Sequence, residues 1–310
     1  MGGQAVLEGV MMRGATEWAV AVRLPDGSIE TIQQTAPGWT DRWRAVPIVR
    51  GVVSMAESLT LGYKALSWSA TKSLAAEAEA DPDMPELSER AIGWTMAGAM
   101  LVFSALFIVL PALLIRGVTH HWTFLPFQLT EGVFRLVLFL GYMLLVSRLA
   151  DIRRVFEYHG AEHKTIAAYE NGVELTPETA QQFTTAHVRC GTNFLLTVMV
   201  VAIVVYSVVP TPNLIAIIAS RVVLLPVIAG ISYELIRGAA KHLDRRWVRA
   251  MMRPGLLLQR LTTREPSVDQ LEVAIASLRA VLTADELAEI EARSGVRVPP
   301  VTPFLGLRNA

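Results

Sequence analysis

The chain has 310 residues, of which 52% are hydrophobic and 18% are charged, and its mean hydropathy is +0.40. Soluble globular domains carry about a quarter charged residues, so this composition indicates a membrane protein. Lys and Arg together number 28 and balance 28 Asp and Glu, so there is no basic excess and no nucleic-acid partner is expected. The single cysteine, Cys190, excludes a framework of internal disulfides.

The N-terminal region, 1–74, is expected to begin with a β-hairpin. Apolar residues alternate with small or polar ones between Trp18 and Leu24, as on a half-buried strand. The stretch 25–27 has turn-forming residues and precedes a second alternating stretch at 28–32. These features predict two antiparallel strands joined by a short turn.

A helix is expected to follow the hairpin. From 47 to 71 the chain is apolar except for Arg50, Glu57 and Lys64, whose spacing of seven places them on one helical face. This pattern fits an amphipathic helix on the membrane surface, and it fits equally well a helix packed on the hairpin. The acidic segment 75–92, which contains prolines, is expected to be a linker.

Four apolar runs are each close to the twenty or so helical residues that cross a hydrocarbon core. They lie at 93–116, 131–148, 192–209 and 213–236. Basic residues precede the first run, separate the second from the third and follow the fourth, whereas the connections 117–129 and 210–212 hold none. By the positive-inside rule, both termini and the segment 149–191 are therefore cytoplasmic. The sequence predicts a four-span domain, 93–236, that includes this cytoplasmic segment.

Charged residues inside the apolar runs need partners. Glu131 and Arg135 have the i,i+4 spacing of a helical ion pair. Arg221 lies roughly 12 Å along the fourth run at 1.5 Å per residue, deep enough to require a polar partner or a watery pocket.

The C-terminal region, 237–295, is expected to form cytoplasmic helices. Apolar residues recur at helical spacing between 270 and 294, and Thr283 is placed to cap the second helix of a pair. The proline-containing tail, 296–310, is expected to be irregular. The fold class predicted for the chain is a mainly α membrane protein, with about four transmembrane helices, a small N-terminal β-hairpin and cytoplasmic amphipathic helices.

A metal-binding pattern lies in the middle cytoplasmic segment. His159, Glu162 and His163 form His-x-x-Glu-His, the inverted form of the zinc-protease helix motif. On a helix the two histidines are one turn apart and can bind one divalent ion, for which zinc is the natural candidate. Glu162 then lies beside them as a general base for a hydrolytic reaction.

Glu234 is the first choice for a third ligand. It falls at the cytoplasmic end of the fourth run, on the same predicted side of the membrane as the histidines. Soluble inverted zinc proteases also take a glutamate ligand well downstream of the pair. The alternative is that Glu234 is an interfacial acid paired with Arg237 or Lys241.

Three other residues are alternative ligands: Cys190, His187 and Glu8. Thiolate and imidazole both suit zinc, so Cys190 and His187 compete for the position. Cys190 also fits a buried free thiol or a nucleophile with a histidine base. Glu8 stands in a glycine-rich apolar stretch, where it binds the metal, orients a ligand, or is satisfied by backbone N–H groups or Arg13.

The chain resembles a bacterial membrane-protein family catalogued as domain of unknown function 1385. The resemblance rests on GGQAVLEGVMMRG at 2–14, YHGAEHKT at 158–165, RCGT at 189–192 and PGLLLQ at 254–259. It covers nearly all of the chain to about residue 278. The family is labelled a predicted metal-dependent enzyme, so the resemblance implies such an activity, with no established substrate or reaction.

These observations favour a four-span protein of the bacterial inner membrane with a hydrolytic metal site on its cytoplasmic face. Its expected metal ligands are His159, His163 and Glu234, with Glu162 as the base. The competing hypothesis is a non-enzymatic membrane scaffold or biogenesis factor, in which the same polar groups form closed hydrogen-bond networks.

Overall fold

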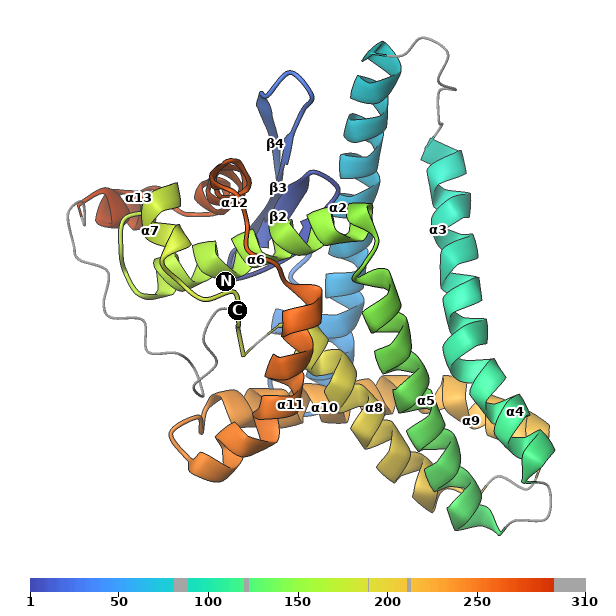
Figure 1. Ribbon diagram of the computed structural model, residues 1–310. Coiled ribbons are helices and arrows are strands. Elements are labelled where there is room, and N and C mark those ends of the chain that lie inside the picture. The colour runs from blue at the N-terminus through green and yellow to red at the C-terminus, as the bar shows by residue number, and fades with distance from the viewer. Residues whose placement is uncertain (81–88, 120–122, 189, 211–212, 293–310) are drawn as a thin grey trace.

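The computed structural model describes residues 1–292 except 81–88, 120–122, 189 and 211–212. It is mostly helical, with one small sheet near the N-terminus (Figure 1). The elements form a body of sheet and helices from which long apolar helices extend on one side.

The sheet is an antiparallel meander of four strands in sequence order. The strands are β1 (Gly2–Val6), β2 (Gly9–Arg13), β3 (Glu17–Arg23) and β4 (Ile29–Thr35). The predicted hairpin is confirmed as β3 and β4, with Val20 opposite Ile32. The glycine-rich N-terminal motif adds β1 and β2, which the sequence analysis did not predict. They are joined by a two-residue turn in which Glu8 has a positive φ of 53°.

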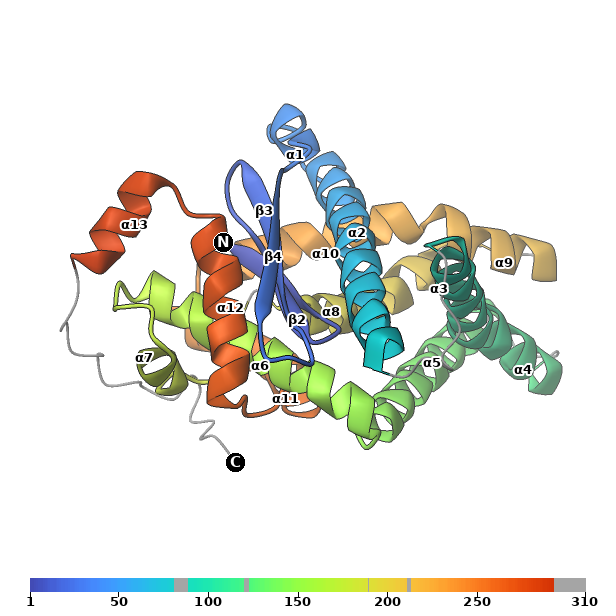
Figure 2. The same cartoon turned by 90° about the horizontal axis from the view of Figure 1, so that it is seen from above.

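Helices cover both faces of this sheet (Figure 2). On one face α2 (Val49–Ala80) packs Leu61 and Ala65 against Trp18 and its strand neighbours. On the other face α6 (Ala150–Glu170) and α12 (Val268–Ala280) bury a larger core with Met12 and Ala19. The alternation of the strands therefore buries both sheet faces.

The charged face of α2 is engaged within the protein. Arg50 binds Glu234, and the fully buried Glu57 accepts hydrogen bonds from Arg13 and Thr40, whereas Lys64 is exposed. The structure thus shows α2 packed on the sheet. The expected linker at 75–92 is helical at both ends, because α2 continues to Ala80 and α3 begins at Glu89; the intervening 81–88 lie outside the described residues.

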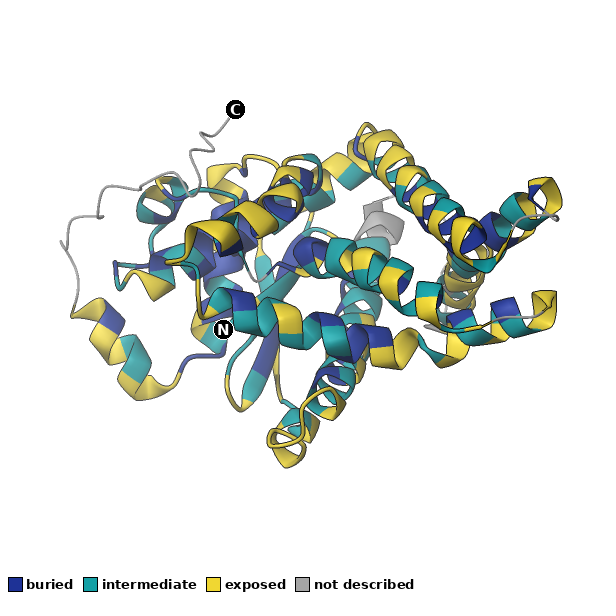
Figure 3. Cartoon of the chain, turned by 90° about the horizontal axis from the view of Figure 1, so that it is seen from below, coloured by how far each residue is buried: buried dark blue, intermediate teal, exposed yellow. Residues whose placement is uncertain are grey.

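Three described helical segments are long and apolar enough to cross a membrane: Gly93–Val118, Phe124–Val146 and Gly191–Val208. The first combines α3 (Glu89–Ser104), the π-helical turn η1 (Ala105–Val109) and α4 (Leu110–Val118); the others are α5 and α8. A fourth candidate is the pair α9 (Leu214–Val223) and α10 (Leu225–Ala240), bent by 44°. Pro226 at the start of α10 removes a backbone donor there. Exposed residues recur along these helices (Figure 3), and they include Val102, Val137 and Val204.

Buried charges join the candidate spans. The Glu131 and Arg135 side chains pair as predicted, and Glu131 also pairs with Arg221 at 3.2 Å. The Arg221 guanidinium lies over the Tyr206 ring, 3.8 Å from its centroid. Arg135 Nε donates to the Phe107 carbonyl in the π-helical turn at 2.9 Å. Arg221 therefore has the partners that its depth requires.

The C-terminal region forms three helices: α11 (Arg246–Thr262), α12 and α13 (Ala284–Glu291). The expected helical pair is α12 and α13, and Thr283 caps the second with Glu286 in a capping box. Helix α11, which contains Pro254 and is rich in arginine, lies in the region 237–295 that was expected to be helical, although its own bounds were not predicted. The short helices α1 (Trp39–Arg42) and α7 (Pro177–Gln181) complete the described elements. The tail 296–310 lies outside the described residues.

Candidate metal centre

Helix α6 holds both histidines of the motif in a fixed position. Its middle is buried between the sheet, α7 and α12. At Gly160 a Cβ atom would lie 1.9 Å from the Arg264 carbonyl oxygen, so only glycine permits this approach. The Arg264 N–H in turn donates to the Phe156 carbonyl at 2.9 Å. The segment after α11 is thereby held against the helical turn that carries His159.

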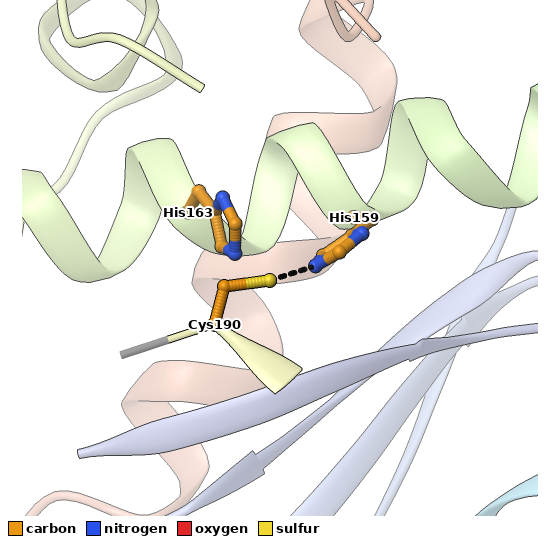
Figure 4. Close-up of side chains that lie close together, drawn as sticks. All are labelled: His159, His163 and Cys190. Atoms are coloured by element: carbon orange, nitrogen blue, oxygen red, sulfur yellow. Dashed lines mark hydrogen bonds between the residues drawn. The ribbon is translucent and has the colours of Figure 1, made fainter. Parts of the chain in front are cut away.

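Cys190 completes a cluster of three side chains that could hold a metal ion. It is the N-cap residue of α8, and its thiol accepts a hydrogen bond from the Thr192 N–H at 3.4 Å. Its Sγ lies 3.3 Å from His159 Nε2, and the ligand atoms of Cys190, His159 and His163 all lie within 4.8 Å of one another. Figure 4 shows the thiol directed at the two imidazoles. This spacing suits three ligands of one ion.

Backbone carbonyls fix the orientation of both imidazoles. His159 Nδ1 lies 2.8 Å from the Thr262 carbonyl oxygen, and His163 Nδ1 lies 2.5 Å from that of Thr185. Because a carbonyl can only accept, each Nδ1 carries the proton and donates. Each Nε2 is then left as the atom that can bind a metal, an arrangement typical of metal-ligating histidines.

The cluster is strongly coupled electrostatically. Burial opposes ionisation of Cys190, but hydrogen bonds from His159 and His163 outweigh it and hold the pKa of the thiol well below its usual value. Burial likewise opposes protonation of His159, yet the hydrogen bond and charge of Cys190 raise the pKa of His159 to about 9. Thiolate and imidazolium therefore stabilise each other when no ion is bound. A divalent cation would take the place of the imidazolium proton.

Glu162 lies beside the cluster but has a different environment. Its side chain is only 5% exposed and, among the described residues, makes no hydrogen bond or ion pair. Burial raises the pKa of Glu162, while the charges of His163 and His159 oppose that increase. A Cβ atom at Gly3 would lie 3.0 Å from its carboxylate, so Glu162 sits directly over β1. A buried carboxylate with an elevated pKa next to three ligands has the properties of a general base.

Glu234, the expected third ligand, is not brought to the histidines. Its carboxylate binds the Arg50 guanidinium through both oxygens and accepts a 3.4 Å hydrogen bond from the Ile48 N–H. The ion pair fastens α10 to the start of α2. Glu234 thus lies in a structural ion pair, although its partner is Arg50 and neither Arg237 nor Lys241. A shared predicted side of the membrane did not imply contact with the motif.

Glu8 supports α6 and lies outside the donor cluster. Its carboxylate forms a two-pronged ion pair with Arg154 and accepts a 3.4 Å hydrogen bond from the Tyr158 hydroxyl. Arg13, its expected partner, pairs with Glu57. Because Tyr158 directly precedes His159, this contact fastens the turn of α6 that carries the first histidine to the β1–β2 turn.

His187 lies near the cluster without joining it. Its ring centroid is 5.6 Å from that of His163, and its Nε2 lies 3.6 Å from a Glu170 carboxylate oxygen. The Gln259 side chain accepts a hydrogen bond from the His187 backbone N–H at 2.9 Å and donates one to the His187 backbone carbonyl at 2.8 Å. Of the three alternatives, Cys190 is the one whose ligand atom lies within 4.8 Å of those of both histidines among the described residues.

Several residues that support the cluster were assigned no role from the sequence. Thr185 and Thr262 act through backbone carbonyls, which every residue possesses. The Thr192 hydroxyl, 3.1 Å from that of Thr262, lies at the start of α8 beside Cys190. Gly3 belongs to a motif that the sequence analysis singled out, but its contact with Glu162 depends on the packing of α6 over β1.

Comparison with known proteins places the chain in a family. The model of the family described as "Protein of unknown function (DUF1385)" matches residues 46–284. The chain is also 34% identical over 299 residues to "Uncharacterized protein YqhQ" of Bacillus subtilis (strain 168), a match that covers 93% of this chain and 94% of that protein. The chain therefore belongs to the DUF1385 family. No solved structure matches it.

Proposed function

We propose that this member of the DUF1385 family is a membrane-embedded, metal-dependent hydrolase. Cys190, His159 and His163 are the metal ligands, and Glu162 is the general base. The observation that carries the proposal is the convergence of three ligand atoms within 4.8 Å from α6 and the start of α8. The carbonyl partners of both Nδ1 atoms, which leave Nε2 available, support it independently.

The donor set favours zinc. One thiolate and two imidazoles combine soft and borderline ligands, which zinc prefers over calcium or magnesium. Three protein ligands leave a fourth position for water or substrate, as in catalytic zinc sites. When bound, such an ion supplies Lewis acidity. Glu162 can then accept a proton from water and return it to a leaving group.

We further propose that the four apolar segments span the bacterial inner membrane, with both termini in the cytoplasm. The C-terminal end of α4 and the N-terminal end of α9 lie away from the sheet in both views (Figures 1 and 2), so both connections predicted to be external are at one end of the molecule. The basic residues are concentrated around the other ends. The metal centre then lies at the cytoplasmic boundary, because Cys190 directly precedes the α8 span.

Metal analysis of the detergent-purified protein tests the proposal. We expect about one zinc ion per chain in the unmodified protein and a loss of at least 10- to 100-fold in affinity in Cys190→Ser and His163→Gln. His242→Gln is the matched control, because His242 is exposed in the turn after α10 and its ring bonds only the Gly238 carbonyl. Equal metal content in all four proteins would contradict the proposal.

A second candidate is a thiol hydrolase in which Cys190 is the nucleophile and His159 its base. The 3.3 Å contact between Sγ and Nε2 and the position of the thiol at the start of a long helix favour it. Iodoacetamide labelling separates the two candidates. A metal ligand is alkylated much faster after chelation, whereas a nucleophile reacts equally fast with and without chelator. A metal-free protein with an unreactive thiol would instead favour the scaffold hypothesis.

A further inference from the structure

Strand β1 has one edge without a strand neighbour. It is the first strand of the meander and pairs only with β2. On the β3 side of β2, the Gly14 N–H donates to the Glu17 carbonyl and the Arg23 N–H donates to the Glu8 carbonyl. Residues of β2 with even numbers therefore direct their backbone groups to β3, and those with odd numbers direct theirs to β1.

This alternation determines which groups of β1 face outward. Val6 lies opposite Gly9, and Gln4 lies opposite Met11, so these residues of β1 exchange hydrogen bonds with β2. The N–H and carbonyl groups of Gly3 and Ala5 then point away from the sheet. Within the described part of the chain these groups have no hydrogen-bond partner, and both residues are partly exposed. Unpaired edge groups of this kind are a template for another strand.

The open edge lies next to Glu162. The Glu162 carboxylate lies over Gly3, where a Cβ atom would come within 3.0 Å of it. A cavity of about 360 Å³ opens at the same end of β1 but on the opposite face of the sheet, toward α2; its lining includes Gly3, Arg13 and Leu61 and does not include Glu162. A strand added to β1 would pass within a few ångströms of Glu162, because neighbouring strands lie about 4.8 Å apart.

We propose that the substrate of this site is an extended polypeptide that binds as an added strand along β1, and that the bond cleaved is a backbone amide near Glu162. This inference rests on the proposed hydrolytic function. Water adds across the amide: the acyl carbon gains the hydroxyl group, the C–N bond breaks, and Glu162 transfers the remaining proton from water to the leaving nitrogen. The products are a carboxylic acid and an amine.

The edge favours a polypeptide over a lipid ester. Gly3 and Ala5 each present one donor and one acceptor, separated by two residues along the strand. An extended peptide presents the complementary groups at the same repeat, which is the basis of recognition by strand addition. A lipid ester has acceptors but no backbone N–H groups to match the carbonyls.

The experiment compares two proline variants of the full-length protein in detergent, each in a Glu162→Gln background. Ala5→Pro removes one outward N–H of β1 without removing a bond to β2, since proline is tolerated where an edge N–H faces away from the sheet. Thr31→Pro is the matched control, on strand β4 at the other edge of the sheet. The Leu24 N–H donates to the Ser28 carbonyl at 2.9 Å, so the residues of β4 with even numbers direct their backbone groups to β3. The Thr31 N–H therefore faces outward.

The probe is fluorescein-labelled, reduced and carboxymethylated lactalbumin, an unfolded polypeptide, and binding is measured by fluorescence anisotropy. We expect Ala5→Pro to weaken binding about fivefold, as for one lost hydrogen bond, and Thr31→Pro to leave it unchanged. Equal binding by both variants would overturn the proposal.

Hydrogen exchange supplies a readout that needs no proline variant. The probe should slow exchange of the Gly3 and Ala5 amides and leave that of Thr31 unchanged. Unchanged exchange at all three would also overturn it.

Two further measurements separate this inference from the proposed function. They are metal content and cleavage of the probe, made on the same proline variants with Glu162 retained. A zinc-containing protein that cleaves a small ester but neither binds nor cleaves the polypeptide would overturn the substrate assignment alone. A protein without metal that binds the polypeptide in an Ala5-dependent manner, and does not cleave it, would overturn the hydrolase.

Discussion

At the scale of single residues, Glu162 differs from the cluster beside it in its hydrogen bonding. His159, His163 and Cys190 each present a ligand atom with a supporting hydrogen bond, whereas the Glu162 carboxylate is buried without a hydrogen-bond partner in the described chain. Burial of a carboxylate without a hydrogen bond or ion pair costs free energy, and groups of this kind are concentrated at functional sites. The ligands and the base can therefore be separated by substitution.

Glu162→Gln should retain the metal and abolish hydrolysis. Glutamine keeps nearly the same shape and volume but cannot accept a proton from water at neutral pH. Metal content and cleavage of the polypeptide probe are measured on the same preparation. If the variant loses its metal, Glu162 is a ligand and the assignment of the base is wrong.

Glu234→Gln should leave the metal in place, because Glu234 binds Arg50 away from the cluster. The ion pair is partly exposed, so its loss should lower the free energy of unfolding by only about 0 to 1 kcal/mol. Arg50→Gln should have a similar effect, since it breaks the same pair. Thermal unfolding and metal analysis check both variants, and loss of metal in Glu234→Gln alone would restore Glu234 as a ligand.

Three of the four residues of the candidate site, His159, Glu162 and His163, could be predicted from the residues themselves. The spacing of His159 and His163 on a helix indicated a pair of ligands, and thiol chemistry kept Cys190 as an alternative. Glu234 was preferred because it shares a predicted membrane side with the histidines. A shared side does not fix a distance, and the orientation of α10 against α2 takes its carboxylate to Arg50 instead.

At the scale of elements, helices and strands with a regular apolar pattern could be predicted, whereas those with an interrupted pattern could not. The β3–β4 hairpin and the α12–α13 pair have clear alternation or capping signals, and both are present. In α11, by contrast, Pro254 and many arginines mask the apolar face that packs on α8 and α10. Strands β1 and β2 are five residues each and rich in glycine, so tertiary packing decides their conformation.

The packing of α6 makes a prediction at this scale. Gly160→Ala should force α6 away from the Arg264 carbonyl, which a Cβ atom would approach to 1.9 Å, and lower the free energy of unfolding by about 1 to 3 kcal/mol. Metal affinity should fall as well, because His159 moves with the helix.

Gly238→Ala is the control for this helix substitution. A Cβ atom at Gly238 meets no atom within 4 Å, so alanine should be neutral or stabilising there. Thermal unfolding and zinc titration of the two variants provide the comparison. Equal stability and equal zinc affinity would show that the approach of α6 to Arg264 does not position the site.

At the scale of the whole molecule, the sheet and its covering helices form a body at one end of the candidate spans. The candidate metal site lies at the junction, because Cys190 directly precedes α8 while the histidines belong to the body. Cys190 therefore links the body to the spans, as does the Arg50–Glu234 ion pair between α2 and α10. The sequence predicted four apolar segments; three described helical segments are long and apolar enough to cross a membrane, and the fourth candidate is the pair α9 and α10, whose 44° bend falls beside Pro226.

The proposed topology predicts the outcome of thiol labelling in intact cells. In a Cys190→Ser background, Thr123→Cys should react with a membrane-impermeant maleimide, because Thr123 lies in a connection predicted to be external. Gln34→Cys, exposed on β4 of the body, should react only after the cells are broken. Labelling of Gln34→Cys in intact cells would reverse the orientation and place the metal centre outside.

The most direct test of the metal centre is the optical spectrum of the cobalt-substituted protein. Cobalt(II) replaces zinc in sites of this kind and reports both its geometry and its ligands. We predict intense visible bands of a tetrahedral ion together with a thiolate-to-cobalt charge-transfer band, and we predict that Cys190→Ser removes the charge-transfer band while His242→Gln keeps it. A spectrum of octahedral cobalt without a thiolate band, identical in the unmodified protein and in Cys190→Ser, would contradict a centre built from Cys190, His159 and His163.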